Sequence, residues 1–190
     1  MQELKFKIFD TPGKENTKET LELAKLNADL LNIKKIVLAS TGGYTINQAI
    51  NIFDPSIYEL IVVTHNFGFR DGLGQEFPEK LRNELEKQGI KVITGVLAFS
   101  GVGSSLLRKY QQYDYTTMFA RLIRTVMCQG IKVVMEIVLM ACDAGAVDVG
   151  EDVISIASTG RGADTCCLIK STSTRLFENL RVKAILAKPL

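Results

Sequence analysis

Two short apolar segments of strand length constrain the fold of this chain more than any other feature. Residues 35–39 read KIVLA and residues 60–64 read LIVVT, so apolar side chains occupy successive positions rather than alternate ones. Strands that are buried on both faces have this pattern, which is typical of parallel sheets covered by helices. The sequence therefore predicts an α/β protein with a largely parallel sheet.

Helical patterns alternate with these strands along the chain. Apolar residues recur at helical spacing over residues 17–32, and Pro78 and Gly89 mark the start and the end of another helix. The remaining helices are predicted over residues 44–53, 101–110 and 116–145, the last of these divided near Gln129 and Gly130. Further strands are predicted at residues 92–93, 153–157 and 166–169.

The N-terminal segment has a different rhythm. Leu4, Phe6 and Ile8 alternate with Lys5 and Lys7. A period of two is typical of a half-buried strand. We therefore predict a strand here, with the three apolar side chains facing the core.

Near the C-terminus, the strands at 153–157 and 166–169 are separated by only a short Gly-rich loop. A parallel return would need a crossover of about a dozen residues, so this pair is predicted to be antiparallel. A last segment, residues 182–187, is predicted as a strand or a short helix. Together the elements predict one domain over residues 1–190, a three-layer α/β/α sandwich whose mostly parallel sheet has an antiparallel edge.

Composition narrows the class of partner. Lys and Arg number 23 and Asp and Glu number 21, which leaves a net charge of +2. A nearly neutral chain lacks the basic field that nucleic-acid binding requires, so we expect no nucleic-acid partner. The most apolar stretch, residues 131–149, is interrupted by Lys132, Glu136 and Asp143, so we expect no membrane span. No apolar leader opens the chain, and we expect a cytoplasmic protein.

The cysteines and the histidine argue against a metal site. Cys128, Cys142, Cys166 and Cys167 form no CxxC pair, and His65 is the only histidine. The ligand spacing of a zinc site is therefore missing. All four cysteines lie in apolar runs, and we expect them to be buried, reduced thiols.

One short motif occurs twice and gives the main functional signal. Residues 39–42 and residues 157–160 both read ASTG, and each copy follows a predicted strand. Ligands of open α/β sheets bind beyond the carboxyl ends of the strands, where the strand order reverses. If the two strands are neighbours there, hydroxyl groups, backbone N–H groups and Arg161 would form a phosphate site. The alternative is that each motif is an ordinary strand-end turn.

Other polar residues are predicted at the same end of the sheet. Thr64, His65 and Asn66 follow the second buried strand, and His65 is either a pocket residue or a histidine satisfied by the backbone. Ser100 and Gly101 follow the third strand, where a helix start explains them without any ligand.

Two carboxylates in apolar surroundings need an explanation. Glu136 lies in the apolar run VVMEIVLM, so it is either paired with Lys132 along the helix or faces a cavity. Asp164 follows the second ASTG motif and either orients Arg161 or accepts from a ligand hydroxyl group.

Six stretches of the chain resemble a known family: IVLASTGGYT, LIVVTHNFGF, FSGVGSS, QGIKVVMEIVLMACDAG, VGEDVISIASTGRGADT and ILAKP. They follow one another in the expected order over nearly the whole chain. The chain thus resembles the stand-alone archaeal and bacterial proteins related to the C-terminal domain of pyruvate kinase. After the third strand it departs from them, because it reads GVGSS where relatives more often carry a charged residue after Gly-Val.

The resemblance implies an α/β/α sandwich and a ligand. In pyruvate kinase the loop corresponding to residues 40–43 holds the phosphate of a sugar-phosphate effector. In the stand-alone proteins the same pocket is similar to a flavin mononucleotide (FMN) site. These 190 residues contain no barrel domain, so phosphotransfer from phosphoenolpyruvate is not implied.

We therefore expect a small phosphorylated ligand, with FMN as the cofactor and the reaction unknown; the alternative is a non-catalytic sensor of a phosphorylated metabolite. A hydrolase using His65 with Asp164 or Glu136 has no supporting motif spacing. Met118, Phe119, Leu122 and Met127 form an apolar set that serves either the core or a homo-oligomer. The predicted cofactor-binding residues are Ser40, Thr41, Gly42, Gly43, Tyr44, Thr45, Thr64, His65, Asn66, Ser100, Gly101, Glu136, Thr159, Gly160, Arg161, Gly162, Ala163 and Asp164.

Overall fold

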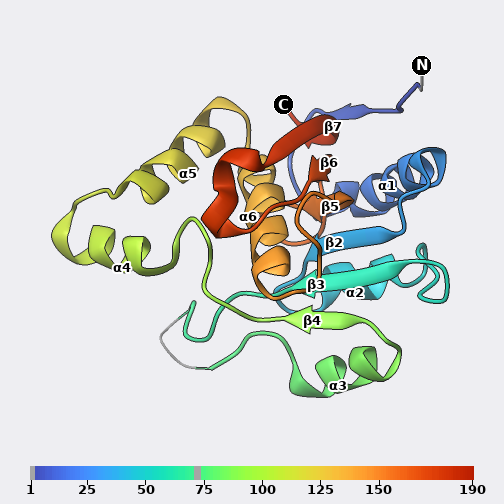
Figure 1. Ribbon diagram of the computed structural model, residues 1–190, viewed down its shortest axis with the longest axis horizontal. Coiled ribbons are helices and arrows are strands. Elements are labelled where there is room, and N and C mark those ends of the chain that lie inside the picture. Colours follow the sequence, from blue (N-terminus) through green and yellow to red (C-terminus); the bar gives the residue numbers. More distant parts are fainter. Residues whose placement is uncertain (1–2, 71–73) are drawn as a thin grey trace.

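A computed structural model describes residues 3–70 and 74–190 of the chain. These residues form one sheet of seven strands in the order β1-β7-β6-β5-β2-β3-β4 (Figure 1). The strands are β1 (Lys7–Phe9), β2 (Lys35–Ala39), β3 (Glu59–Val63), β4 (Lys91–Ile93), β5 (Asp152–Ala157), β6 (Thr165–Lys170) and β7 (Arg181–Pro189).

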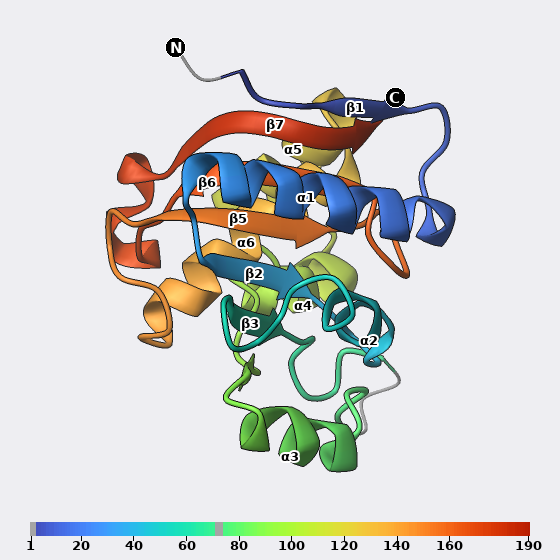
Figure 2. The same ribbon diagram turned by 90° about the vertical axis from the view of Figure 1, so that its right-hand side faces the viewer.

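Helices cover both faces of this sheet, and Figure 2 shows α1 and α6 on opposite sides of it. Ile36 and Leu38 of β2 pack with α1, α2 and α3, whereas Val37, which points the other way, packs with α6. The α-helices are α1 (Thr17–Leu31), α2 (Tyr44–Ala49), α3 (Glu79–Lys87), α4 (Gly101–Tyr110), α5 (Tyr115–Val126) and α6 (Gln129–Asp143). The predicted three-layer α/β/α sandwich is thus confirmed.

The sheet is parallel except at β6. Strand β6 pairs antiparallel with β5 on one side and with β7 on the other, while β5, β2, β3 and β4 run parallel to one another. The predicted antiparallel pair is therefore present, and the segment predicted as strand or short helix is β7. Its partner β1 completes this side of the sheet by parallel pairing.

Helix α6 is buried along nearly its whole length and forms the centre of its layer. Gly130 explains how it approaches the sheet so closely, because a Cβ atom there would lie 1.9 Å from the Thr165 hydroxyl oxygen. The predicted division near Gln129 is two residues late, since α5 ends at Val126 and α6 begins at Gln129. All four cysteines are buried and unpaired, as predicted.

The N-terminal strand has the opposite phase to the predicted one. Phe6 and Ile8 are 70% and 49% exposed, whereas Phe9 is buried. Lys7 and Phe9 share the inward phase, and Lys7 Nζ lies 2.9 Å from Glu19 Oε1 of α1. The reason is that β1 is an edge strand, paired with β7 alone. The alternation of apolar and polar residues in the sequence therefore predicts a strand but not which of its two faces is buried.

Two other differences are local. The helix predicted over residues 44–53 ends at Ala49 and continues as turns. Two 3₁₀ helices, Lys14–Asn16 and Thr174–Asn179, have no counterpart in the prediction. Within the described ranges, no helix combines the length and the apolar character needed to cross a membrane.

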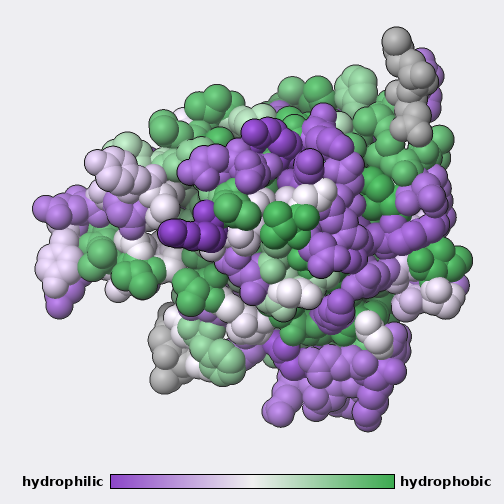
Figure 3. Space-filling model, in the orientation of Figure 1, coloured by the Kyte–Doolittle hydropathy of each residue, from purple (hydrophilic) through white to green (hydrophobic). Residues whose placement is uncertain are grey.

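The apolar set on α5 divides between core and surface. Met118 and Leu122 are about half exposed, whereas the Phe119 ring packs against Phe99 and Phe177. Figure 3 shows hydrophobic and hydrophilic side chains intermixed over the α4 and α5 side of the molecule. Homo-oligomer formation stays a prediction.

Candidate functional site

The two ASTG motifs lie beside each other because β2 and β5 are parallel neighbours. The carboxyl ends of β2 and β5 therefore lie at the same edge of the sheet. After β2 the chain continues to β3, on the side away from β5, and after β5 it continues to β6, on the side away from β2. The Thr45 hydroxyl donates to the Gly162 carbonyl oxygen at 3.0 Å and so joins the two loops. This is the reversal of strand order at which open α/β sheets bind ligands.

Between the loops lies a cleft of about 510 Å³. Its volume falls in the range of small-molecule and cofactor pockets, roughly 300–1,000 Å³. The predicted residues that line it are Ser40, Thr41, Gly42, Tyr44, Thr45, His65, Thr159, Gly160, Arg161 and Gly162.

Among the described residues, Arg161 supplies the unpaired positive charge of this cleft, because Arg70, which also lines it, forms an ion pair with Glu76. Its guanidinium carbon lies 4.6 Å from the centre of the Tyr44 ring, a cation–π contact that joins the two loops a second time. Among residues 3–70 and 74–190, no carboxylate forms an ion pair with it. The guanidinium thus has hydrogen-bond donors left for an anion in the cleft. Helix α2 has only six residues, so its N-terminus adds little to this charge.

Asp164 does not line the cleft but shapes its wall. The carboxylate is fully buried and accepts from Gly13 N at 3.1 Å, Ser158 Oγ at 3.1 Å and Thr159 N at 3.1 Å. The Thr165 hydroxyl donates to it at 2.7 Å. Asp164 thus fixes the backbone of residues 158–164, the loop that carries Arg161, through its own contacts rather than through a bond to the Arg161 side chain.

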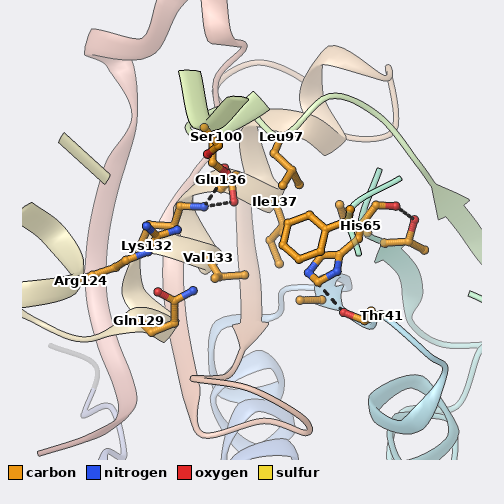
Figure 4. Close-up of a pocket in the computed structure, with 15 residues that line it drawn as sticks. Thr41, His65, Leu97, Ser100, Arg124, Gln129, Lys132, Val133, Glu136 and Ile137 are labelled. Carbon is orange, nitrogen blue, oxygen red and sulfur yellow. Dashed lines mark hydrogen bonds and ion pairs between the residues drawn. The ribbon is translucent and has the colours of Figure 1, made fainter. Parts of the chain in front are cut away.

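A smaller cavity of about 170 Å³ continues inward from the cleft, between α6, α4 and the end of β3 (Figure 4). Thr64, Ser100 and Glu136, all predicted from the sequence, line this inner cavity. It shares Thr41, His65, Gln129 and Val133 with the cleft, so one molecule can extend through both or two molecules can lie in contact.

His65 stands at the junction of the two spaces. Its Nδ1 lies 2.8 Å from Glu76 Oε2 and its Nε2 lies 3.5 Å from the Thr41 hydroxyl oxygen. Because a carboxylate only accepts, Nδ1 carries a proton and Nε2 is directed towards Thr41. The Phe69 ring is stacked on the imidazole at a centroid distance of 3.7 Å. His65 thus contacts neither Asp164 nor Glu136, the two partners that a hydrolase reading requires.

Glu136 is paired, as its spacing from Lys132 predicted. Its carboxylate accepts from the Lys132 ammonium, from Phe99 N at 2.9 Å and from Ser100 Oγ at 3.2 Å. Both charged side chains are at most 4% exposed. Burial lowers the pKa of Lys132 below the ordinary lysine value against the attraction of Glu136, and the positive charge of Arg124 lowers it further.

Five of the predicted residues lie outside both spaces, and Asp164, described above, is one of them. Gly43 is the N-cap of α2 with φ 89°, and a Cβ atom there would lie 2.3 Å from a Leu81 methyl carbon. Ala163 is fully buried. Asn66 and Gly101 line an adjoining groove, which shares Phe69 and Leu97 with the inner cavity.

Sequence reasoning missed several residues of the site. Glu76 binds His65 from a distant loop position, and Arg124 reaches the inner cavity from α5. Gln129 and Val133 lie one turn apart in the first turns of α6, are partly buried, and line both spaces. No local motif marks these residues, because each reaches the site through the packing of helices and loops on the sheet.

A search against models of known protein families found none that matches this chain. Over the described ranges, no group of three or more His, Cys, Asp and Glu side chains is arranged to hold a metal ion. The cleft and the inner cavity are therefore the candidate functional site of this protein.

Proposed function

We propose that the cleft binds a small phosphorylated ligand, and that this ligand is FMN. The observation that carries the proposal is the Arg161 guanidinium, which forms no ion pair with a carboxylate of residues 3–70 and 74–190 and lies between two hydroxyl-bearing loops at the carboxyl ends of β2 and β5. Such a guanidinium, in a cleft that Thr41 and Thr159 also line, suits a phosphate group.

The residues present fit such a ligand. A cleft of about 510 Å³ has the size of a cofactor pocket. The phosphate would lie on Ser40–Tyr44 and Thr159–Arg161, with the ring towards His65 and Phe69. A bound flavin would supply electron-transfer chemistry that amino-acid side chains lack. The resemblance to stand-alone relatives of the pyruvate kinase C-terminal domain supports the same ligand.

A second candidate, a sensor of a sugar phosphate, is favoured by the polar lining. The hydroxyl groups of Ser40, Thr41, Thr45 and Thr159 surround the cleft and suit a polyhydroxylated ligand. In this alternative the phosphate group of the ligand binds at the same position, and a sugar takes the place of the flavin.

Binding of FMN and riboflavin, which differ by the phosphate, tests the proposal. Flavin fluorescence titration should give a tighter dissociation constant for FMN than for riboflavin. Arg161→Gln should weaken FMN binding about 10- to 100-fold, the effect of losing a charged hydrogen bond, and should change riboflavin binding little. Arg175→Gln removes an exposed arginine away from the cleft and serves as the matched control.

The outcomes separate the candidates. Equal loss of both flavins in Arg161→Gln would reject a phosphate contact. If neither flavin binds but a hexose phosphate raises the melting temperature, the sensor is correct, because a ligand of the native state stabilises it. If none of these ligands binds, the cleft is not a phosphate site.

A further inference from the structure

The inner cavity has features that the phosphate site does not explain. Arg124 and Lys132 both reach it from the α5–α6 side, and Figure 4 shows them near one another. Thr41 and His65 lie across the cavity from them (Figure 4). Lys132 is 3% exposed and is therefore a charge built into the wall, whereas Arg124 is an exposed side chain of α5 whose charge borders the cavity.

The charges around this cavity do not balance. Glu136 is the single acidic side chain of its lining, and it already accepts from Lys132, Phe99 N and Ser100 Oγ. Arg124 has no carboxylate partner among residues 3–70 and 74–190. Counted over the described residues, the lining therefore carries one net positive charge, that of the exposed Arg124, next to the buried Lys132–Glu136 ion pair. Two cations that repel each other at a cavity are stabilised by an anion between them.

The size and the remaining walls define the chemistry of that anion. A volume of about 170 Å³ holds a molecule of about six non-hydrogen atoms, if each takes roughly the 30 Å³ of a water molecule. Val63, Leu97, Val133 and Ile137 form an apolar wall, which suits a short carbon chain. One net charge matches a monoanion, and a phosphate dianion would leave an excess charge against the apolar wall.

We propose that the inner cavity is a subsite for a small monocarboxylate, whose carboxylate binds Arg124 and Lys132 and whose carbon chain lies on the apolar wall. Ser104 and Gln129 supply further polar contacts. Through the shared Thr41 and His65, this molecule would lie in contact with the occupant of the cleft. The subsite does not depend on the cleft ligand being FMN.

Propionate and propionamide, which have the same size and differ in charge, are the probes for this subsite. In ligand-observed NMR titrations of the protein without added flavin, propionate should bind saturably in the millimolar range. Propionamide should bind at least tenfold more weakly. Arg124→Gln should weaken propionate binding about tenfold or more, as expected for a lost charged hydrogen bond.

Two control variants keep the result specific. Arg121→Gln removes an exposed arginine from the same helix outside the cavity lining and should leave propionate binding unchanged. Arg161→Gln should also retain it, so that failure of the phosphate site and failure of this subsite give different results. Absence of saturable binding, equal binding of the amide, or full binding by Arg124→Gln would each overturn the proposal.

Discussion

Asp164 determines the shape of one wall of the cleft although it contacts no ligand space. Its carboxylate accepts from backbone and hydroxyl donors of three segments: residue 13, residues 158–159 and residue 165. A fully buried carboxylate is stable only when such donors surround it. The donors are thereby oriented, and the loop that carries Arg161 acquires a fixed backbone.

We therefore expect Asp164→Ala to unfold more easily than the native protein. Removing the carboxylate leaves several buried donors without an acceptor, and we expect a loss of about 3 kcal/mol in the free energy of unfolding. Urea denaturation followed by circular dichroism measures it. Asp10→Ala removes an exposed aspartate and should change stability by less than about 0.5 kcal/mol. A similar small change in Asp164→Ala would show that the donors are satisfied without the carboxylate.

The contacts of Asp164 could not be predicted from the residues next to it in the sequence. The second ASTG motif predicted a loop at a strand end, and the structure has that loop. The role of Asp164 depends on Gly13, which is 151 positions away in the chain, and on the way the segment after β1 crosses the loop. Spacing within the motif carries no information about that contact.

At the scale of elements, α6 joins the site to the core. Its spacing predicted the Lys132–Glu136 pair, because residues four apart share a helix face. What the sequence did not predict is that Glu136 also binds Phe99 N and Ser100 Oγ, the residues that lead into α4. One buried carboxylate thus fixes the start of α4 against α6 and closes the end of the inner cavity.

A double-mutant cycle should reveal strong coupling within this pair. Lys132→Met leaves a buried carboxylate without its cation, and we expect it to lower the free energy of unfolding by about 3 kcal/mol or more. Glu136→Gln should cost less, because its amide oxygen can still accept from Phe99 N and because burial, which lowers the pKa of Lys132, reduces the cost of removing its proton. The double variant should be more stable than Lys132→Met.

The exposed pair Lys80–Glu84 gives the comparison for this cycle. It has the same four-residue spacing, but its side chains are 90% and 53% exposed. Its coupling should stay below about 1 kcal/mol in the same urea experiment. Equal coupling in the two pairs would mean that burial does not strengthen the interaction of Lys132 with Glu136.

At the scale of the whole molecule, the sequence predicted the layers better than the pocket. The apolar runs of β2 and β3 defined a buried parallel sheet, because few other structures bury a strand on both faces. The edge of the sheet was predicted less well than its centre. Strand β1 pairs with β7, which lies at the other end of the chain, and the prediction of which face of β1 is buried was wrong. The inner cavity forms only where α4, α5, α6 and the end of β3 meet, so no segment alone encodes it.

The two adjacent cysteines of β6 should report the unfolding of the whole sheet. Cys166 packs into one layer and Cys167 into the other, and both are fully buried in a strand flanked by β5 and β7. Burial raises the pKa of both thiols above the ordinary cysteine value, so the reactive thiolate is scarce as well as inaccessible. In a Cys128→Ser/Cys142→Ser variant, a thiol reagent should therefore modify neither residue until the protein unfolds globally. Thiol reactivity measured at increasing urea gives the free energy of the opening that exposes these cysteines. This free energy should equal the free energy of global unfolding measured by circular dichroism. A value well below the free energy of global unfolding would show that β6 separates from its neighbours in a local event.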